Sequence, residues 1–151
     1  MQDGVNLRAV DIIESIRGPY ELGPGATIAP LGNGHINETR LVTDGARKLV
    51  AQRINTSVFT DPKRLVHNAR TVESFLSGVT GAPRVVHHLR GNDGAWLHGP
   101  NRDVRVLEYV PGSYSAEVLE SPGQAEVAAR CFARFSRFLD GIDRSELAIV
   151  I

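Results

Sequence analysis

The stretch "LGNGHINETRLVT", residues 31–43, decides how this chain is folded. It opens with two glycines one residue apart and closes as a strand of alternating character. A hairpin turn needs only two residues of this kind. A backbone that must lie close to a ligand phosphate needs the same glycines. The stretch by itself therefore allows two interpretations, a tight turn with a polar tip or a phosphate-binding loop.

The composition is that of an ordinary globular protein. The chain has 151 residues, of which 42% are hydrophobic and 23% charged, and its formal net charge is zero. This length suits one domain or one large lobe of a bigger protein. The balanced charge argues against a nucleic-acid partner, because binding to a phosphate backbone needs an excess of Lys and Arg. A single cysteine, Cys131, excludes an internal disulfide and a cysteine-based zinc site.

No segment indicates a membrane or an export signal. No apolar run approaches the roughly 20 residues of a membrane span. The N-terminal stretch "MQDGVNLRAVDIIESIRG" mixes acidic with apolar residues and lacks the apolar region of a signal peptide. We therefore expect no membrane partner and a cytoplasmic location.

The apolar periodicity predicts an α+β fold. Helices are expected over residues 7–16, 62–77 and about 122–140, and strands over residues 27–32, 38–43, 48–55, 82–91, 95–99 and 103–110. The order is helix, three strands, helix, three strands, linker, helix, with no βαβ alternation. Such an order is typical of an antiparallel sheet with a helix packed on one face. The second helix is expected to bury Leu65, Val72, Phe75 and Leu76.

Three segments read together resemble the amino lobe of the aminoglycoside-phosphotransferase superfamily. They are "GNGHINETRLVT", "LVAQRINTSVFTDPKRLVHN" and "VLEYVPGSYS". They are most similar to the N-acetylhexosamine 1-kinase branch, whose pattern is G-x-G-H-I-N-x-T followed by Q-x-[IM]-N-T-x-[VI]-F. The match spans most of residues 23–140. The resemblance implies a protein-kinase-like amino lobe plus the first helix of the carboxy lobe, and Mg-ATP as phosphoryl donor. It implies the anomeric hydroxyl of an N-acetylhexosamine as acceptor.

The resemblance divides the chain and assigns its site. It implies an N-terminal helix and linker (1–22), a nucleotide-binding lobe (23–112), and a hinge exit with the first helix of a carboxy lobe (113–151). In kinases of this kind a glycine-rich turn covers the phosphates, the third strand carries a phosphate-pairing side chain, and the hinge holds adenine. The implied nucleotide-binding residues are Gly32, Asn33, Gly34, His35, Asn37, Gln52, Arg53, Glu108, Tyr109 and Val110.

Several positions depart from the kinase pattern. Asn37 stands where the third glycine of G-x-G-x-x-G would be, and Gln52 stands where many kinases have a lysine. Strand alternation sends neighbours to opposite faces, so either Gln52 or Arg53 faces the nucleotide, but not both. The only carboxylate inside the second helix is Glu73, which we expect to be a solvated surface residue. His87 and His88 are expected to be ordinary strand residues.

The catalytic motifs of the family are not found in the sequence. None of its Asp residues lies in an H-N-D-x-x-x-x-N or a later D-x-D context. We therefore assign no catalytic residue and no metal ligand here, expect the Mg²⁺ ligands in a carboxy lobe, and expect this chain by itself not to turn over. The alternative is a non-catalytic α+β binding or interaction module.

The last expected helix carries an apolar stripe. Ala128, Phe132, Phe135 and Leu139 follow one another at steps of four, three and four residues. Burying each large side chain is worth roughly 1.5–3 kcal/mol, so the stripe is expected to find a partner. We expect a homodimer or a larger species formed through this helix and the tail "ELAIVI".

Overall fold

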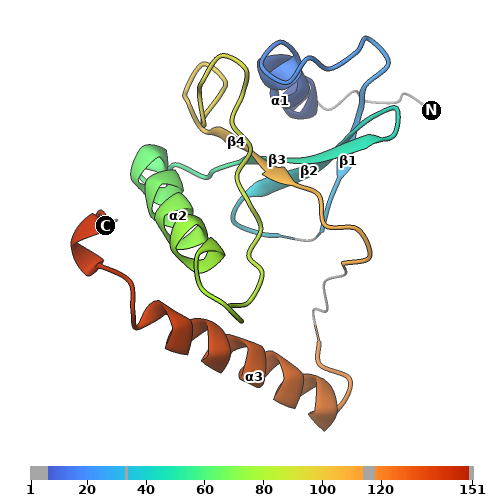
Figure 1. Ribbon diagram of the computed structural model, residues 1–151. Coiled ribbons are helices and arrows are strands. Elements are labelled where there is room, and N and C mark those ends of the chain that lie inside the picture. Colours follow the sequence, from blue (N-terminus) through green and yellow to red (C-terminus); the bar gives the residue numbers. More distant parts are fainter. Residues whose placement is uncertain (1–6, 33, 114–117, 150–151) are drawn as a thin grey trace.

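The computed structural model describes residues 7–32, 34–113 and 118–149. Three helices and four strands follow one another in the order α1, β1, β2, β3, α2, β4, α3 (Figure 1). The helices are α1 (Leu7–Arg17), α2 (Pro62–Ser77) and α3 (Pro122–Leu139), followed by the 3-10 turn η1 (Arg144–Glu146). The strands are β1 (Thr27–Pro30), β2 (Glu38–Asp44), β3 (Arg47–Arg53) and β4 (Val104–Glu108). The expected α+β class with an antiparallel sheet is confirmed.

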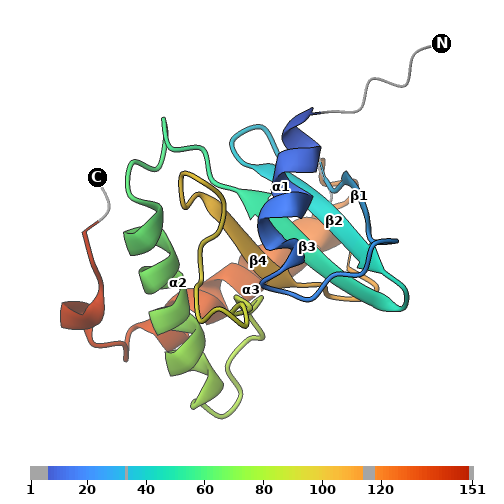
Figure 2. The same ribbon diagram turned by 90° about the horizontal axis from the view of Figure 1, so that it is seen from above.

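The four strands form one antiparallel sheet in the order β1-β2-β3-β4. Helix α1 lies across one face of this sheet, and α2 lies beyond its β4 side (Figures 1 and 2). Helix α3 lies on the other side of the sheet from α1 (Figure 1). Its contacts to the rest of the chain are near the end of α2, where the Arg134 guanidinium donates to the Gly81 carbonyl at 3.0 Å.

The hydrophobic core lies between α1 and the sheet. Ile12 and Ile16 of α1 are fully buried, as are Ala51 of β3 and Val104 and Val106 of β4. The strand partners Val42–Leu49 and Ala51–Val106 stand directly opposite each other in this core. Because side chains alternate along a strand, the residues between them must point to the other face.

The other face of the sheet, which we call the open face, is not part of either hydrophobic core cluster. Following the register from strand to strand, it carries Ala29, Leu41 and Thr39, Val50 and Gln52, and Arg105 and Leu107. Apart from the exposed Ala29, these residues are half-buried.

The expectation of six strands is wrong. Residues 82–91 and 95–99 form only isolated bridges, His88 to Leu107 and His98 to Val104. Residues 87–89 do run along the outer edge of β4, because Leu89 N–H donates to the Val106 carbonyl at 2.8 Å and Glu108 N–H to the His87 carbonyl at 2.9 Å. The backbone N–H of His88 points away from β4 and donates to the Glu73 carboxylate at 3.1 Å. A side chain from α2 therefore ends the sheet where another strand would have paired.

Helices α2 and α3 begin as the sequence predicts. The Asp61 carboxylate accepts the Arg64 N–H at 3.1 Å at the start of α2, and the Ser121 hydroxyl accepts the Gln124 N–H at 3.3 Å at the start of α3. The buried residues of α2 are Val66, Glu73 and Leu76, so of the four expected only Leu76 is fully buried. Helix α3 has no buried residue. Within the described ranges, the helices are too short or too polar to cross a bilayer.

Candidate functional site

The open face carries an apolar row that runs straight across the sheet. Ala29 stands opposite Leu41, Leu41 opposite Val50, and Val50 opposite Leu107. These four residues, which we call the apolar row, are small or branched, and three of them are half-buried. The row therefore offers a flat hydrophobic surface next to the end of β4, where the chain leaves the sheet.

A polar row lies beside it, two residues closer to the glycine-rich turn. It consists of Thr39, Gln52 and Arg105, which also stand opposite one another. The Gln52 amide N–H donates to the Thr39 hydroxyl at 2.8 Å. The Gln52 carbonyl oxygen accepts from Arg105 Nε at 2.9 Å and Nη2 at 2.7 Å. Both polar ends of Gln52 are thus engaged, and the positive charge of this row belongs to Arg105.

The polar row continues into α2 through a buried histidine. Arg105 Nη1 lies 3.1 Å from His88 Nε2, and His88 Nδ1 lies 2.5 Å from Glu73 Oε1. Burial lowers the pKa of His88, whereas its hydrogen bond to Glu73 acts in the opposite direction. Our expectation that Glu73 is a solvated surface residue is wrong, because Glu73 is only 9% exposed. His88 therefore connects two charged groups, the Arg105 guanidinium and the Glu73 carboxylate.

The glycine-rich turn joins β1 and β2 at the end of the polar row. Gly32 has a φ of +70°, a conformation that favours glycine. At Gly34 an added Cβ would meet only the Asn37 carbonyl, at 3.6 Å, so there is space for a side chain. His35 is exposed. Asn33 lies outside the described residues.

The Asn37 side chain has a hydrogen-bond partner in the segment after β3. Its side-chain oxygen accepts the backbone N–H of Asn55 at 2.9 Å, which ties the turn to the exit of β3. The Asn55 side chain accepts in turn from the Ser57 N–H at 3.0 Å. Asn37 of "GHIN" is therefore hydrogen-bonded to Asn55 of "INT", and this bond fixes the position of the turn relative to β3.

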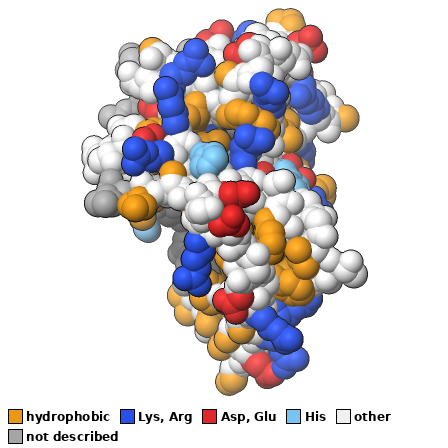
Figure 3. Space-filling model, turned by 60° about the vertical axis from the view of Figure 1, so that its left-hand side comes forward, with side chains coloured by type: hydrophobic (Ala, Val, Ile, Leu, Met, Phe, Trp, Pro, Cys, Tyr) orange, Lys and Arg blue, Asp and Glu red, His pale blue; other side chains and the backbone are white. Residues whose placement is uncertain are grey.

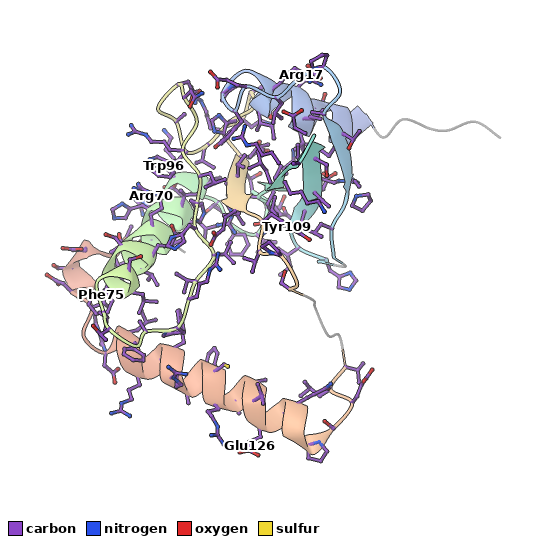
Figure 4. The ribbon with its side chains drawn as sticks, turned by 45° about the vertical axis from the view of Figure 1, so that its right-hand side comes forward. Arg17, Arg70, Phe75, Trp96, Tyr109 and Glu126 are labelled. Carbon is purple, nitrogen blue, oxygen red and sulfur yellow. The ribbon has the colours of Figure 1, made fainter. Side chains whose placement is uncertain are left out.

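The chain leaves the sheet at Glu108, Tyr109 and Val110. The Glu108 carboxylate pairs with Arg84 at 3.0 Å and accepts the His87 N–H at 3.2 Å, so it is held at the outer edge of β4. Lys48 Nζ lies 5.3 Å from the centre of the Tyr109 ring. Figure 4 shows Tyr109 just past the end of β4. Val110 contributes its carbonyl, which accepts the Ser113 hydroxyl at 2.7 Å.

Arg53 lies on the α1 side of the sheet, apart from the other candidate residues. Its guanidinium is 3.8 Å from Glu38 and 4.0 Å from Asp103. It also lines a cavity of about 420 Å³ together with Asp11 and Glu14 of α1. The structure therefore brings Gln52, and not Arg53, to the open face.

The described part of the chain contains no group of three or more His, Cys, Asp or Glu side chains that could hold a metal ion.

No protein-family model matches the chain.

Two features of the site were missed by the sequence reasoning. One is the apolar row, and the other is Arg105 with its link through His88 to Glu73. The alternation in "DVRVLEYV" contains the signal for Arg105, because a cation there falls between two core valines and must face the other side of the sheet. Nothing local in the sequence pairs Glu73 with His88, which are brought together only by the packing of α2.

Proposed function

We propose that this chain is the nucleotide-binding lobe of a small-molecule kinase, in which ATP lies on the open face and its γ-phosphate passes to a sugar hydroxyl. The observation that carries the proposal is the pair of neighbouring rows, one apolar and one polar, between the exit of β4 and the glycine-rich turn. A nucleotide has the same division into a flat apolar base and a charged tail.

The adenine ring would lie on the apolar row beside Tyr109 and Val110, whose main chain could bond the edge of the base. The phosphates would then extend over the polar row toward Gly32, where the backbone can come close to them. Transfer would be direct and in line, and the lobe would contribute positioning and charge neutralisation.

The acceptor class rests on the resemblance alone. The motif "GHIN" followed by "INT" and "VF" favours an N-acetylhexosamine. We assign no catalytic residue of this chain to the transfer step.

A second candidate is a non-catalytic interaction module. The observation that favours it is the exposed apolar surface of α3, where Val127 is 62% and Phe132 72% exposed. Hydrophobic side chains are visible over α3 at the bottom of Figure 3. An interaction module would use this surface and would not need the open face.

Binding of adenosine by the 151-residue chain distinguishes the two candidates. We expect NMR titration to place the shift changes on the apolar row, and Val50→Lys to weaken adenosine binding at least about tenfold, since a charge then stands under the base. Val58→Lys is the matched control, because Val58 is 52% exposed in the turn after β3. If neither adenosine nor ATP binds at millimolar concentration, or if the two variants bind alike, the nucleotide-binding role is wrong.

A further inference from the structure

Within the described residues, Arg105 forms no ion pair or hydrogen bond with a carboxylate. In the part of the chain that the structure describes, its hydrogen-bond partners are the Gln52 side-chain oxygen and the His88 ring, both neutral acceptors. The side chain is half-buried, and burial lowers the pKa of Arg105 while the charge of Glu73 opposes this. A partly desolvated guanidinium in such surroundings is stabilised when an anion binds to it.

The proton positions follow from what arginine can do. A guanidinium only donates, so His88 Nε2 must accept from it. The ring proton is therefore on Nδ1 and is donated to Glu73. A neutral ring thus joins a cation to a carboxylate, and the two charges stay separate. The groups that face His88 are Glu73 and Arg70 of α2, Arg105 of β4, and the neighbouring His87, whose Nδ1 is 3.7 Å from Glu73.

The Arg105 guanidinium also has N–H groups beyond those directed at Gln52 and His88. A guanidinium has five N–H groups, and three of them are directed at Gln52 and His88. One N–H remains on each terminal nitrogen. Two N–H groups on one planar cation can bind two phosphate or carboxylate oxygens at once.

We infer that Arg105 is the cation that pairs with the ATP phosphates, and that Glu73 and His88 hold its guanidinium in position. The inference rests on the proposed function and deepens it. In protein kinases a lysine on the third strand, oriented by a helix glutamate, has this task. In this chain Gln52 occupies the position of that lysine and holds the Arg105 guanidinium. The positive charge therefore comes from Arg105 on the neighbouring strand, and the helix glutamate, Glu73, contacts it through His88.

Charge removal on the two faces of the sheet tests the assignment of Arg105. The 151-residue chain is titrated with inorganic tripolyphosphate, ATP and adenosine, and compared with Arg105→Met and Arg53→Met. Arg105→Met should weaken tripolyphosphate and ATP binding at least about tenfold and leave adenosine binding within about twofold. Arg53→Met removes the same charge on the α1 side and should change none of the three affinities more than about twofold.

The outcomes separate this inference from the proposed function. If ATP binds the wild type and Arg105→Met equally well, the role of Arg105 is wrong while nucleotide binding stands. If tripolyphosphate binding depends on Arg105 but adenosine never binds, the anion site stands and the nucleotide-binding function is overturned.

The positioning role of His88 needs its own variants. In His88→Gln the amide can still accept from Arg105 and donate to Glu73, whereas His88→Leu can do neither. We expect the ratio of ATP to adenosine affinity to fall several-fold in His88→Leu and to be largely restored in His88→Gln. A role in packing alone would leave this ratio unchanged in both variants, and that result would overturn the link through His88.

Discussion

The two faces of the sheet are built from the same strands but hold different kinds of side chain. On the α1 side, Ala51, Val104 and Val106 are fully buried under Ile12 and Ile16. On the open face, the residues between them are half-buried and include a complete polar row. One face therefore holds the lobe together, whereas the other keeps polar groups hydrogen-bonded but within reach of solvent.

Two buried histidines show the same contrast. His98, on the α1 side, lies 3.1 Å from the Tyr20 hydroxyl, which itself donates to the Leu89 carbonyl. His98 Nε2 must therefore donate to Tyr20, in a pair that closes the core. His88 carries its proton on the other nitrogen and links two charged groups. Burial lowers the pKa of both, but the carboxylate beside His98, that of Asp93, is 3.7 Å from its Nδ1, whereas the Glu73 carboxylate is within hydrogen-bond distance of His88 Nδ1.

The largest expected difference between the faces is in stability. Ile16→Ala should lower the free energy of unfolding by about 2–5 kcal/mol, because Ile16 is fully buried and its loss leaves a cavity. Leu41→Ala on the open face should cost less than about 2 kcal/mol, since this side chain is only half-buried. Urea unfolding of both variants measures the difference. Equal costs would mean that the open face is as much a core as the α1 side.

The glycine-rich turn allows a finer comparison within the site. Gly32→Val forces a branched side chain into φ +70° and should lower the free energy of unfolding by about 1–2 kcal/mol. Gly34→Val should cost less than about 0.5 kcal/mol, because nothing but the Asn37 carbonyl lies near the added Cβ. Unfolding curves that rank the variants in the reverse order would contradict the turn geometry.

The sequence predicts the helices and the first three strands well because their signals are local. Gly18-Pro19 ends α1 at Arg17, the Asp61-Pro62 pair starts α2, and alternation marks β2 and β3. Residues 82–91 also have strand-like composition, but pairing requires a free partner edge. There the Glu73 carboxylate takes the His88 N–H, and this depends on where α2 packs.

Local signals also explain which site residues could be predicted from the sequence and which could not. The glycines and Gln52 are recognised by their place in a motif. Arg105 could have been placed on the face of Gln52 by alternation once β3 and β4 were paired, and the pairing itself is a long-range contact. Glu73 seemed a surface residue because isolated helix carboxylates usually are. Its burial depends on His88, fifteen residues further along the chain.

The buried histidines His88 and His98 should make the protein less stable in acid. Since burial lowers the pKa of His88 and His98 below the ordinary value of 6.5, the unfolded chain binds protons first as the pH falls. The free energy of unfolding should then decrease below about pH 6.5, by at most about 1.4 kcal/mol per pH unit for each histidine. His88→Gln should make this slope shallower between pH 7 and 5. The slopes come from urea unfolding at each pH, and equal slopes in the two proteins would show that His88 is not held neutral by the fold.

The smallest effect on stability is expected at the apolar surface of α3. None of the described residues covers this surface, whereas α1 covers one face of the sheet. Phe132 is 72% exposed, so Phe132→Ser should change the free energy of unfolding by less than about 0.5 kcal/mol. The tail that we expected to join α3 in a homodimer is partly engaged elsewhere, because Asn68 of α2 exchanges two hydrogen bonds with the Ala148 backbone, at 2.7 and 2.8 Å. Pairing of two copies would therefore use α3 itself. Sedimentation should show a dimer that Phe132→Ser weakens. The comparison variant is Phe75→Ser, in the half-buried contact of α2 with Gly141, which should instead lower the free energy of unfolding. A wild-type chain that stays monomeric at high concentration would show that this stripe tolerates water and does not pair.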